Sequence, residues 1–156
     1  MKRKHLYLNL LLLLSLFAAC KKEAHIDTVY PEISNNTANA FPIQCSTLKR
    51  GEKFIFKATF SDNVELGSTS IDIHHNFDHH SHSTEVSDCS LEAIKVPVNP
   101  FVLIKTFPIG AGQTTYTINE ELLIPLNTDP GDYHFLIRLT DKAGWQTIKG
   151  ISIKII

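Results

Sequence analysis

The sequence of 156 residues has one methionine, at its first position, and only three cysteines. It contains no HExxH motif, no glycine-rich phosphate-binding loop and no Gly-x-Ser-x-Gly nucleophile motif. These absences argue against a zinc metalloprotease, a nucleotide-binding enzyme and an α/β-hydrolase. We therefore expect a protein that is not an enzyme.

The sequence also lacks an excess of basic residues, since its formal net charge is −1. Residues 1–19 contain three basic residues, Lys2, Arg3 and Lys4, and no acidic residue, so removing them lowers the charge by three, to −4. A mildly acidic domain is a poor candidate for binding nucleic acid. We expect no nucleic-acid partner.

The N-terminus has the pattern of an export signal. A basic patch at residues 2–4 precedes an apolar run from Leu6 to Ala19, which ends in Ala-Ala directly before Cys20. The run is too short to span a bilayer comfortably, because a transmembrane helix needs about 20 apolar residues. We predict that residues 1–19 are a lipoprotein signal peptide and that Cys20 is the lipidated first residue of the mature protein. The alternative is an ordinary signal peptide with an incidental cysteine.

Lipidation at Cys20 would supply enough acyl chains for stable membrane attachment. We expect the protein to be lipid-anchored at the outer membrane, and the sequence leaves open whether it faces the periplasm or the outside. If Cys20 carries lipid, Cys45 and Cys89 remain as a pair in an oxidising compartment. A disulfide is then expected, with two free thiols as the alternative.

The rest of the chain has the patterning of an all-β domain. Residues 20–40 are polar and irregular, and we interpret them as the lipidated Cys20, a flexible tether and a possible edge strand at 26–33. Period-two alternation of apolar residues then marks short strands separated by turn residues. The expected strands cover residues 52–60, 70–77, 101–107, 114–118, 122–124, 132–140 and 145–155. We predict that residues 41–156 form an immunoglobulin-like β-sandwich of about seven antiparallel strands, with an eight-stranded barrel or jelly roll as the competing architecture.

Two stretches resemble known families. The segment from Pro130 to Trp145 resembles the final hairpin of many bacterial surface immunoglobulin-like domains, which bears on the fold alone. Residues 73–82, with the motif Asp78-His79-His80-Ser81-His82, resemble an uncharacterised family of Gram-negative envelope lipoproteins, a domain of unknown function with an immunoglobulin-like fold. The resemblance covers about residues 28–156. It implies a location and a fold, and it implies no activity.

Histidine is concentrated in one segment. The sequence has eight histidines, and five of them lie between His74 and His82. A turn near Asp78 would bring the two arms of this segment together, and imidazole is the commonest protein ligand for transition metals. We expect Zn²⁺ or Cu²⁺ as the cofactor, because imidazole with one carboxylate suits these ions and soft sulfur ligands are missing. The candidate metal ligands are His74, Asp78, His79, His80 and His82.

Three other histidines are weaker candidates. Strand alternation sends the side chain of His75 away from that of His74. His25 lies in the tether, and His134 is expected on the outward face of a strand. Asp78 is expected either to bind the ion or to orient a histidine ring.

The favoured hypothesis is a non-catalytic, membrane-anchored module that binds a transition metal through a His-rich loop, in contact with an outer-membrane transporter or a surface complex. In the alternative hypothesis, the histidines only shape a loop through hydrogen bonds, and the domain binds a protein or glycan. A glycan platform would need aromatic side chains, and Tyr116, Tyr133 and Trp145 are the candidates. Trp145, however, is more simply expected to cap the core.

Overall fold

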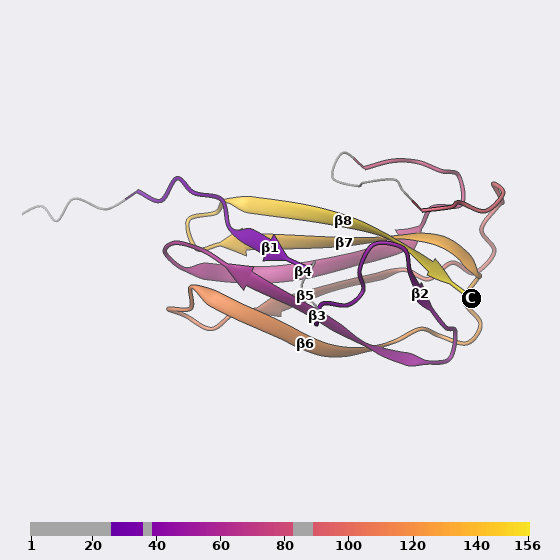
Figure 1. Cartoon of the computed structure of the whole chain (residues 1–156), viewed down its shortest axis with the longest axis horizontal. Helices are drawn as coiled ribbons and strands as arrows, with labels where there is room; N and C mark the ends of the chain where they lie inside the picture. The colour runs from indigo at the N-terminus through magenta and orange to yellow at the C-terminus, as the bar shows by residue number, and fades with distance from the viewer. Residues whose placement is uncertain (1–25, 36–38, 83–88) are drawn as a thin grey trace, which may run out of the picture.

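The structure of the protein is a computed structural model, and it describes residues 26–35, 39–82 and 89–156. Within these residues the chain forms eight strands and no helix (Figure 1). They are β1 (Glu32–Ser34), β2 (Ser46–Leu48), β3 (Lys53–Ser61), β4 (Leu66–His75), β5 (Leu103–Pro108), β6 (Thr115–Leu123), β7 (Gly131–Asp141) and β8 (Gln146–Ile155). A search of the described part of the chain for a helix able to cross a membrane finds none. The predicted signal peptide and Cys20 lie outside the described residues.

The strands form two sheets that pack face to face, as Figure 1 shows. One sheet has the order β1-β3-β6 and the other the order β2-β8-β7-β4-β5. Neighbouring strands are antiparallel except β2, which pairs parallel to β8. The fold is therefore an all-β immunoglobulin-like sandwich, as predicted, in which β2 is a short strand that the sequence did not reveal.

The prediction of a break between two strands at residues 119–121 is wrong. Residues 119–121 were expected to separate two strands, but β6 runs through them without interruption and pairs residue by residue with β3. Ile118 and Leu122 anchor the strand on both sides of this stretch because both are buried, and the two glutamates between them form ion pairs with lysines. Glu120 pairs with Lys105, and Glu121 lies 2.6 Å from the Nζ of Lys53.

The core lies between the two sheets. Buried positions of β3 alternate with less buried ones, and the same holds for β7 beyond Phe135 and for the second half of β8. Burying aromatic and branched side chains is the main favourable term in folding. The largest fully buried side chains include Phe56, Phe60, Ile71, Ile73, Tyr133, Phe135, Ile137 and Ile151.

The outer face of the five-stranded sheet positions the histidines. In the register of β4 with β7, Ile73 opposes Phe135 and both face the core, whereas the next pair, His74 opposite His134, faces outward. Residues opposite each other on one face of an antiparallel pair have Cβ atoms about 5 Å apart. The sheet alone therefore brings two imidazoles together.

Candidate metal site

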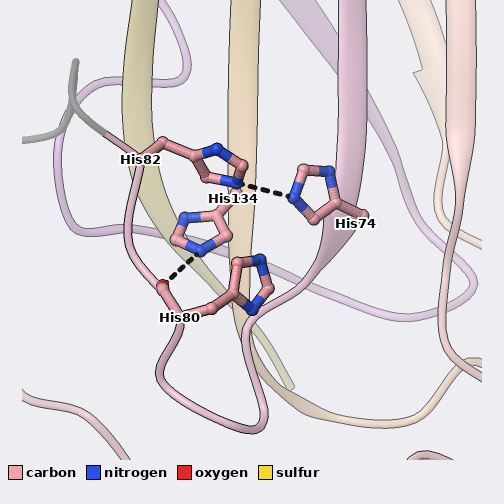
Figure 2. A group of neighbouring side chains, drawn as sticks. All are labelled: His74, His80, His82 and His134. Atoms are coloured by element: carbon pink, nitrogen blue, oxygen red, sulfur yellow. Dashed lines mark hydrogen bonds between the residues drawn. The ribbon is translucent and has the colours of Figure 1, made fainter.

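The segment after β4 folds back over the outer face of the sheet. The amide of Asn76 donates to the carbonyl oxygen of Asp132 at 2.8 Å, and the amide of His79 donates to that of Asn76 at 3.3 Å. His79 has a φ of +60°, in the left-handed region that reverses the chain. This turn places His80 and His82 above the cross-strand pair of His74 and His134 (Figure 2).

The chain beyond this loop is also fixed to the sandwich. Cys89 forms a disulfide with Cys45, with Cα atoms 5.5 Å apart. The amide of Glu92 donates to a carboxylate oxygen of Asp132 at 2.6 Å, and the amide of Lys95 donates to the carbonyl of Phe77 at 3.1 Å. The loop that carries the histidines is therefore attached to the sandwich on both sides.

Four imidazoles meet at this place, and we call them the histidine cluster: His74, His80, His82 and His134. One ring nitrogen from each lies within 4.8 Å of those of the other three. The ring centroids of every pair are between 4.7 and 5.6 Å apart. The Nε2 atoms of His74 and His82 are 3.1 Å apart. This group could hold a metal ion.

Two carboxylates orient rings of the cluster. Asp72 accepts a hydrogen bond from Nδ1 of His74 at 2.8 Å, and Asp78 accepts one from Nδ1 of His80 at 2.5 Å. A carboxylate at neutral pH can only accept, so Nδ1 carries the proton in both rings and the lone pair of the neutral ring is on Nε2. Carboxylate–imidazole pairs of this kind fix metal-binding histidines in their ligating tautomer.

The hydrogen bond from His80 lowers the pKa of Asp78 below its usual value. The Asp78 carboxylate is therefore ionised at neutral pH and orients the ring of His80 there. The orienting effect is lost only as the pH falls through that lowered pKa.

His134 is the member of the cluster that was only a weaker candidate from the sequence. Its predicted outward orientation on β7 is correct, but the ring is only 1% exposed because the 79–82 segment covers it. Its Nε2 donates to the carbonyl oxygen of His80 at 3.0 Å, which leaves the lone pair of the neutral ring on Nδ1. Alternation identified the face of the sheet, but it gave no indication that a loop covers this face.

The other predicted site residues lie around the cluster. His79 hydrogen-bonds through Nε2 to the carbonyl of Glu92 at 2.8 Å, so the structure does not bring it to the other imidazoles. Asp78 contacts His80 and takes the orienting position that was the alternative to direct ligation. The ring of His75 packs on Phe77, with centroids 4.9 Å apart.

The cluster borders an open groove on the outer face of the sheet. The groove encloses about 440 Å³, and His74 and His82 line one part of it. Its remaining walls include Ser70, Asp72, Ile104, Leu136, Arg138 and Ile148. Because His74, His80 and His82 are partly exposed, an ion has a path from solvent to the cluster.

The three aromatics considered for a glycan platform do not share one surface. Tyr133 is only 1% exposed and belongs to the core. Tyr116 packs on Phe60 from the three-stranded sheet. Trp145 is half-buried against Tyr30 and does not cap the core as expected, so a glycan would not meet the three rings together.

Neutralising either of the two orienting carboxylates should loosen the ring that it holds. Asp72→Asn and Asp78→Asn should each weaken Zn²⁺ binding roughly 10-fold, at the low end for residues that orient metal ligands, since both carboxylates are partly exposed. Isothermal titration calorimetry of the untagged chain measures this. Asp129→Asn is the matched control, because its carboxylate caps the amides of Val98 and Asn99 instead of a cluster histidine. Equal affinity in all three variants would show that the carboxylates do not orient ligands.

Comparisons with known proteins identify a family and several similar structures. A family model described as Domain of unknown function (DUF4625) matches residues 18–156. No curated protein matches the chain. Similar solved structures include the GspB Siglec domain, with 19% identity and a TM-score of 0.43 over 83% of this chain and 59% of that one.

Two further solved structures are similar. The sporulation control protein Spo0M from Bacillus subtilis has 10% identity and a TM-score of 0.42, over 82% of this chain and 50% of that one. A family 123 glycoside hydrolase from Clostridium perfringens has 14% identity and a TM-score of 0.38, over 81% of this chain and 27% of that one. The chain thus spans less than two thirds of the length of each of these structures. No catalytic family is indicated by the family match.

Proposed function

Because the chain belongs to the family described as Domain of unknown function (DUF4625), which assigns no activity, we propose from its geometry that it binds a transition-metal ion through the histidine cluster. The observation that carries this proposal is the convergence of one nitrogen from each of four imidazoles within 4.8 Å. Two nitrogens bound to one ion at about 2.1 Å are at most about 4.2 Å apart. Tetrahedral coordination by four nitrogens separates each pair by about 3.4 Å, so shifts of up to about 0.8 Å per nitrogen would let all four bind one ion.

The arrangement of the rings favours Zn²⁺ over Cu²⁺. The centroid of an imidazole lies roughly 3.2 Å from a metal bound at about 2.1 Å, so tetrahedral coordination separates the centroids by roughly 5.2 Å. A square-planar arrangement, which suits Cu²⁺, would separate opposite rings by roughly 6.4 Å. The observed range of 4.7 to 5.6 Å is close to the tetrahedral value for every pair.

The site favours binding over catalysis. Four imidazoles complete a tetrahedral shell, whereas catalytic zinc sites keep one position open for water or substrate. The predicted lipid anchor on Cys20 would hold this module at the outer membrane. We propose that it captures or buffers the ion there and passes it to an outer-membrane transporter or a surface complex.

The test is a titration of the untagged full chain, purified in mild detergent and freed of metal with a chelator. We expect one Zn²⁺ per chain with a dissociation constant below about 1 μM, equivalent to more than 8 kcal/mol. At a hundredfold excess over that constant, the ion should stabilise the fold by about 2.7 kcal/mol and raise the melting temperature by about 10 °C. Calorimetry and differential scanning fluorimetry measure the two effects. No stoichiometric binding of Zn²⁺ or Cu²⁺ would refute the proposal.

A further inference from the structure

Three aspartates from distant parts of the sequence meet at the end of the sandwich away from the histidine cluster. Asp27 precedes β1, Asp62 directly follows β3, and Asp141 is the last residue of β7. One carboxylate oxygen of each lies within 4.8 Å of those of the other two. In the register of β4 with β7, Asp141 opposes Leu66 and His134 opposes His74, so seven residues of β7 separate the two places, roughly 23 Å.

Two of these aspartates are buried although their charge favours water. Asp27 is 8% exposed and Asp141 is 4% exposed. One oxygen of each aspartate accepts hydrogen bonds from N–H groups. Oδ1 of Asp141 accepts them from the amides of Gly144 and Trp145. Oδ1 of Asp62 accepts them from the amides of Val64 and Glu65. The Oδ1 of Asp27 accepts from Val29 and Asn63.

Oδ2 of Asp141 and Oδ2 of Asp62 are buried, and neither accepts a hydrogen bond from the described residues. When an aspartate only caps a turn, its second carboxylate oxygen is usually exposed, and water solvates the charge. A buried carboxylate oxygen without such solvation is strongly disfavoured unless a cation is close.

The described residues provide no such cation. The ion pairs of the described chain involve other carboxylates, and none joins a lysine, arginine or histidine to Asp27, Asp62 or Asp141. Three carboxylates within 4.8 Å repel one another in a partly buried setting. Buried charges that persist in proteins are paired or coordinate a metal.

We propose that Asp27, Asp62 and Asp141 bind a Ca²⁺ ion. All the ligand atoms in this set are carboxylate oxygens, which suit hard cations, and no imidazole or thiolate belongs to it. The three carboxylates come from a segment before β1 and from the ends of two strands, and their first oxygens are already fixed by N–H donors. Ca²⁺ accepts such irregular oxygen sets, whereas Mg²⁺ requires near-octahedral geometry.

Ca²⁺ at this place attaches the N-terminal segment to the sandwich. The indole Nε1 of Trp145 donates to the carbonyl oxygen of Asp27 at 2.9 Å, and its ring packs on Tyr30 with centroids 4.8 Å apart. Thr147 donates from its hydroxyl to the carbonyl of Pro31. The ion adds a bond from Asp27 to the ends of β3 and β7, so it fixes the base of the predicted tether.

The first test uses the untagged full chain in mild detergent, freed of metal with a chelator and then given CaCl₂ alone. We expect Ca²⁺ to raise the melting temperature by several degrees, and MgCl₂ at the same concentration to have a smaller effect. Asp62→Asn keeps an oxygen for the amides of Val64 and Glu65 and removes one charge. We expect this variant to bind Ca²⁺ at least 10-fold more weakly and, without Ca²⁺, to melt no lower than the wild type.

Asp129→Asn is the matched control, because Asp129 also caps backbone amides with one carboxylate but lies outside the three-aspartate group. It should respond to Ca²⁺ as the wild type does. A wild type that does not respond to Ca²⁺ would overturn the proposal. It would also be overturned if Asp62→Asn lowered the melting temperature equally with and without Ca²⁺, since the carboxylate would then only cap a turn.

The second test uses the single tryptophan of the chain. The backbone amide of Trp145 donates to Asp141 at 2.7 Å, so its indole lies close enough to transfer excitation to a Tb³⁺ ion that replaces Ca²⁺. We expect sensitised Tb³⁺ emission that excess Ca²⁺ abolishes and that Asp62→Asn reduces at least 10-fold. Emission unchanged in Asp62→Asn would place the ion elsewhere. The Tb³⁺ emission should persist in the His80→Ala/His82→Ala variant, because this site is separate from the histidine cluster.

Discussion

Replacing His80 and His82 together by alanine should weaken Zn²⁺ binding by roughly 1000-fold or more. A four-ligand zinc site binds with about 10–16 kcal/mol, which corresponds to about 3 kcal/mol per ligand, and the double variant removes two ligands. Both side chains lie on a loop and are partly exposed, so the fold does not depend on them. Calorimetry measures the affinity, and urea unfolding verifies that the variant is folded.

The matched control is His75→Gln/His79→Asn. It also removes two histidines from the same segment, but neither residue belongs to the histidine cluster. Asparagine is chosen for position 79 because it tolerates the φ of +60° there. We expect this control to bind Zn²⁺ as the wild type does. If it lost binding while the His80→Ala/His82→Ala variant kept it, the assignment of the ligands would be wrong.

His134→Ala should also weaken Zn²⁺ binding by at least 10-fold, although its ring lies on a strand far from the His-rich motif in sequence. Because this ring is only 1% exposed, its removal leaves a cavity and lowers the unfolding free energy as well. The affinity must therefore be measured below the melting temperature of the variant. An affinity equal to that of the wild type would remove His134 from the proposed ligand set.

The fold was largely predictable from the sequence because each long strand buries one face. Alternation in residues 52–60 gave the correct inward set, with Phe54, Phe56 and Phe60 buried. The strand β2 was missed because it has only three residues and alternation needs a longer stretch. The continuity of β6 was missed because Glu120 and Glu121 were interpreted as a break, whereas Lys105 of β5 in the other sheet and Lys53 of the neighbouring β3 pair with them.

The candidate site was only partly predictable. His74, His80 and His82 are close in sequence, so their clustering could be recognised before the fold was known. His134 is 52 residues beyond His82 in the sequence, and its proximity depends on the register of β4 with β7. His79 lies outside the cluster because its own backbone is left-handed, and the composition of the segment does not reveal this conformation. The meeting of Asp27, Asp62 and Asp141 was not predicted, because these residues are far apart in the sequence and only the fold brings them together.

Removing the disulfide should have the largest effect on stability. Cys45 and Cys89 are 44 residues apart, and closing a loop of this size in the unfolded chain stabilises the fold by about 4 kcal/mol in the chain-entropy description. Cys45→Ser/Cys89→Ser should therefore lose roughly 2–4 kcal/mol of unfolding free energy, measured by urea denaturation. Reduced wild type is the control, since it should match the double variant, and reductant should not change the variant further.

The same variant tests how the histidine loop is held. Cys89 fixes the chain beyond the loop, while the hydrogen bonds of Asn76 and Glu92 to Asp132 fix it independently of the disulfide. We therefore expect Zn²⁺ affinity to fall by no more than about 10-fold in the double serine variant, because ordering a freer loop has an entropic cost while all four ligands remain. A loss as large as that of His80→Ala/His82→Ala would mean that the disulfide, and not the backbone bonds to β7, positions the loop for the ion.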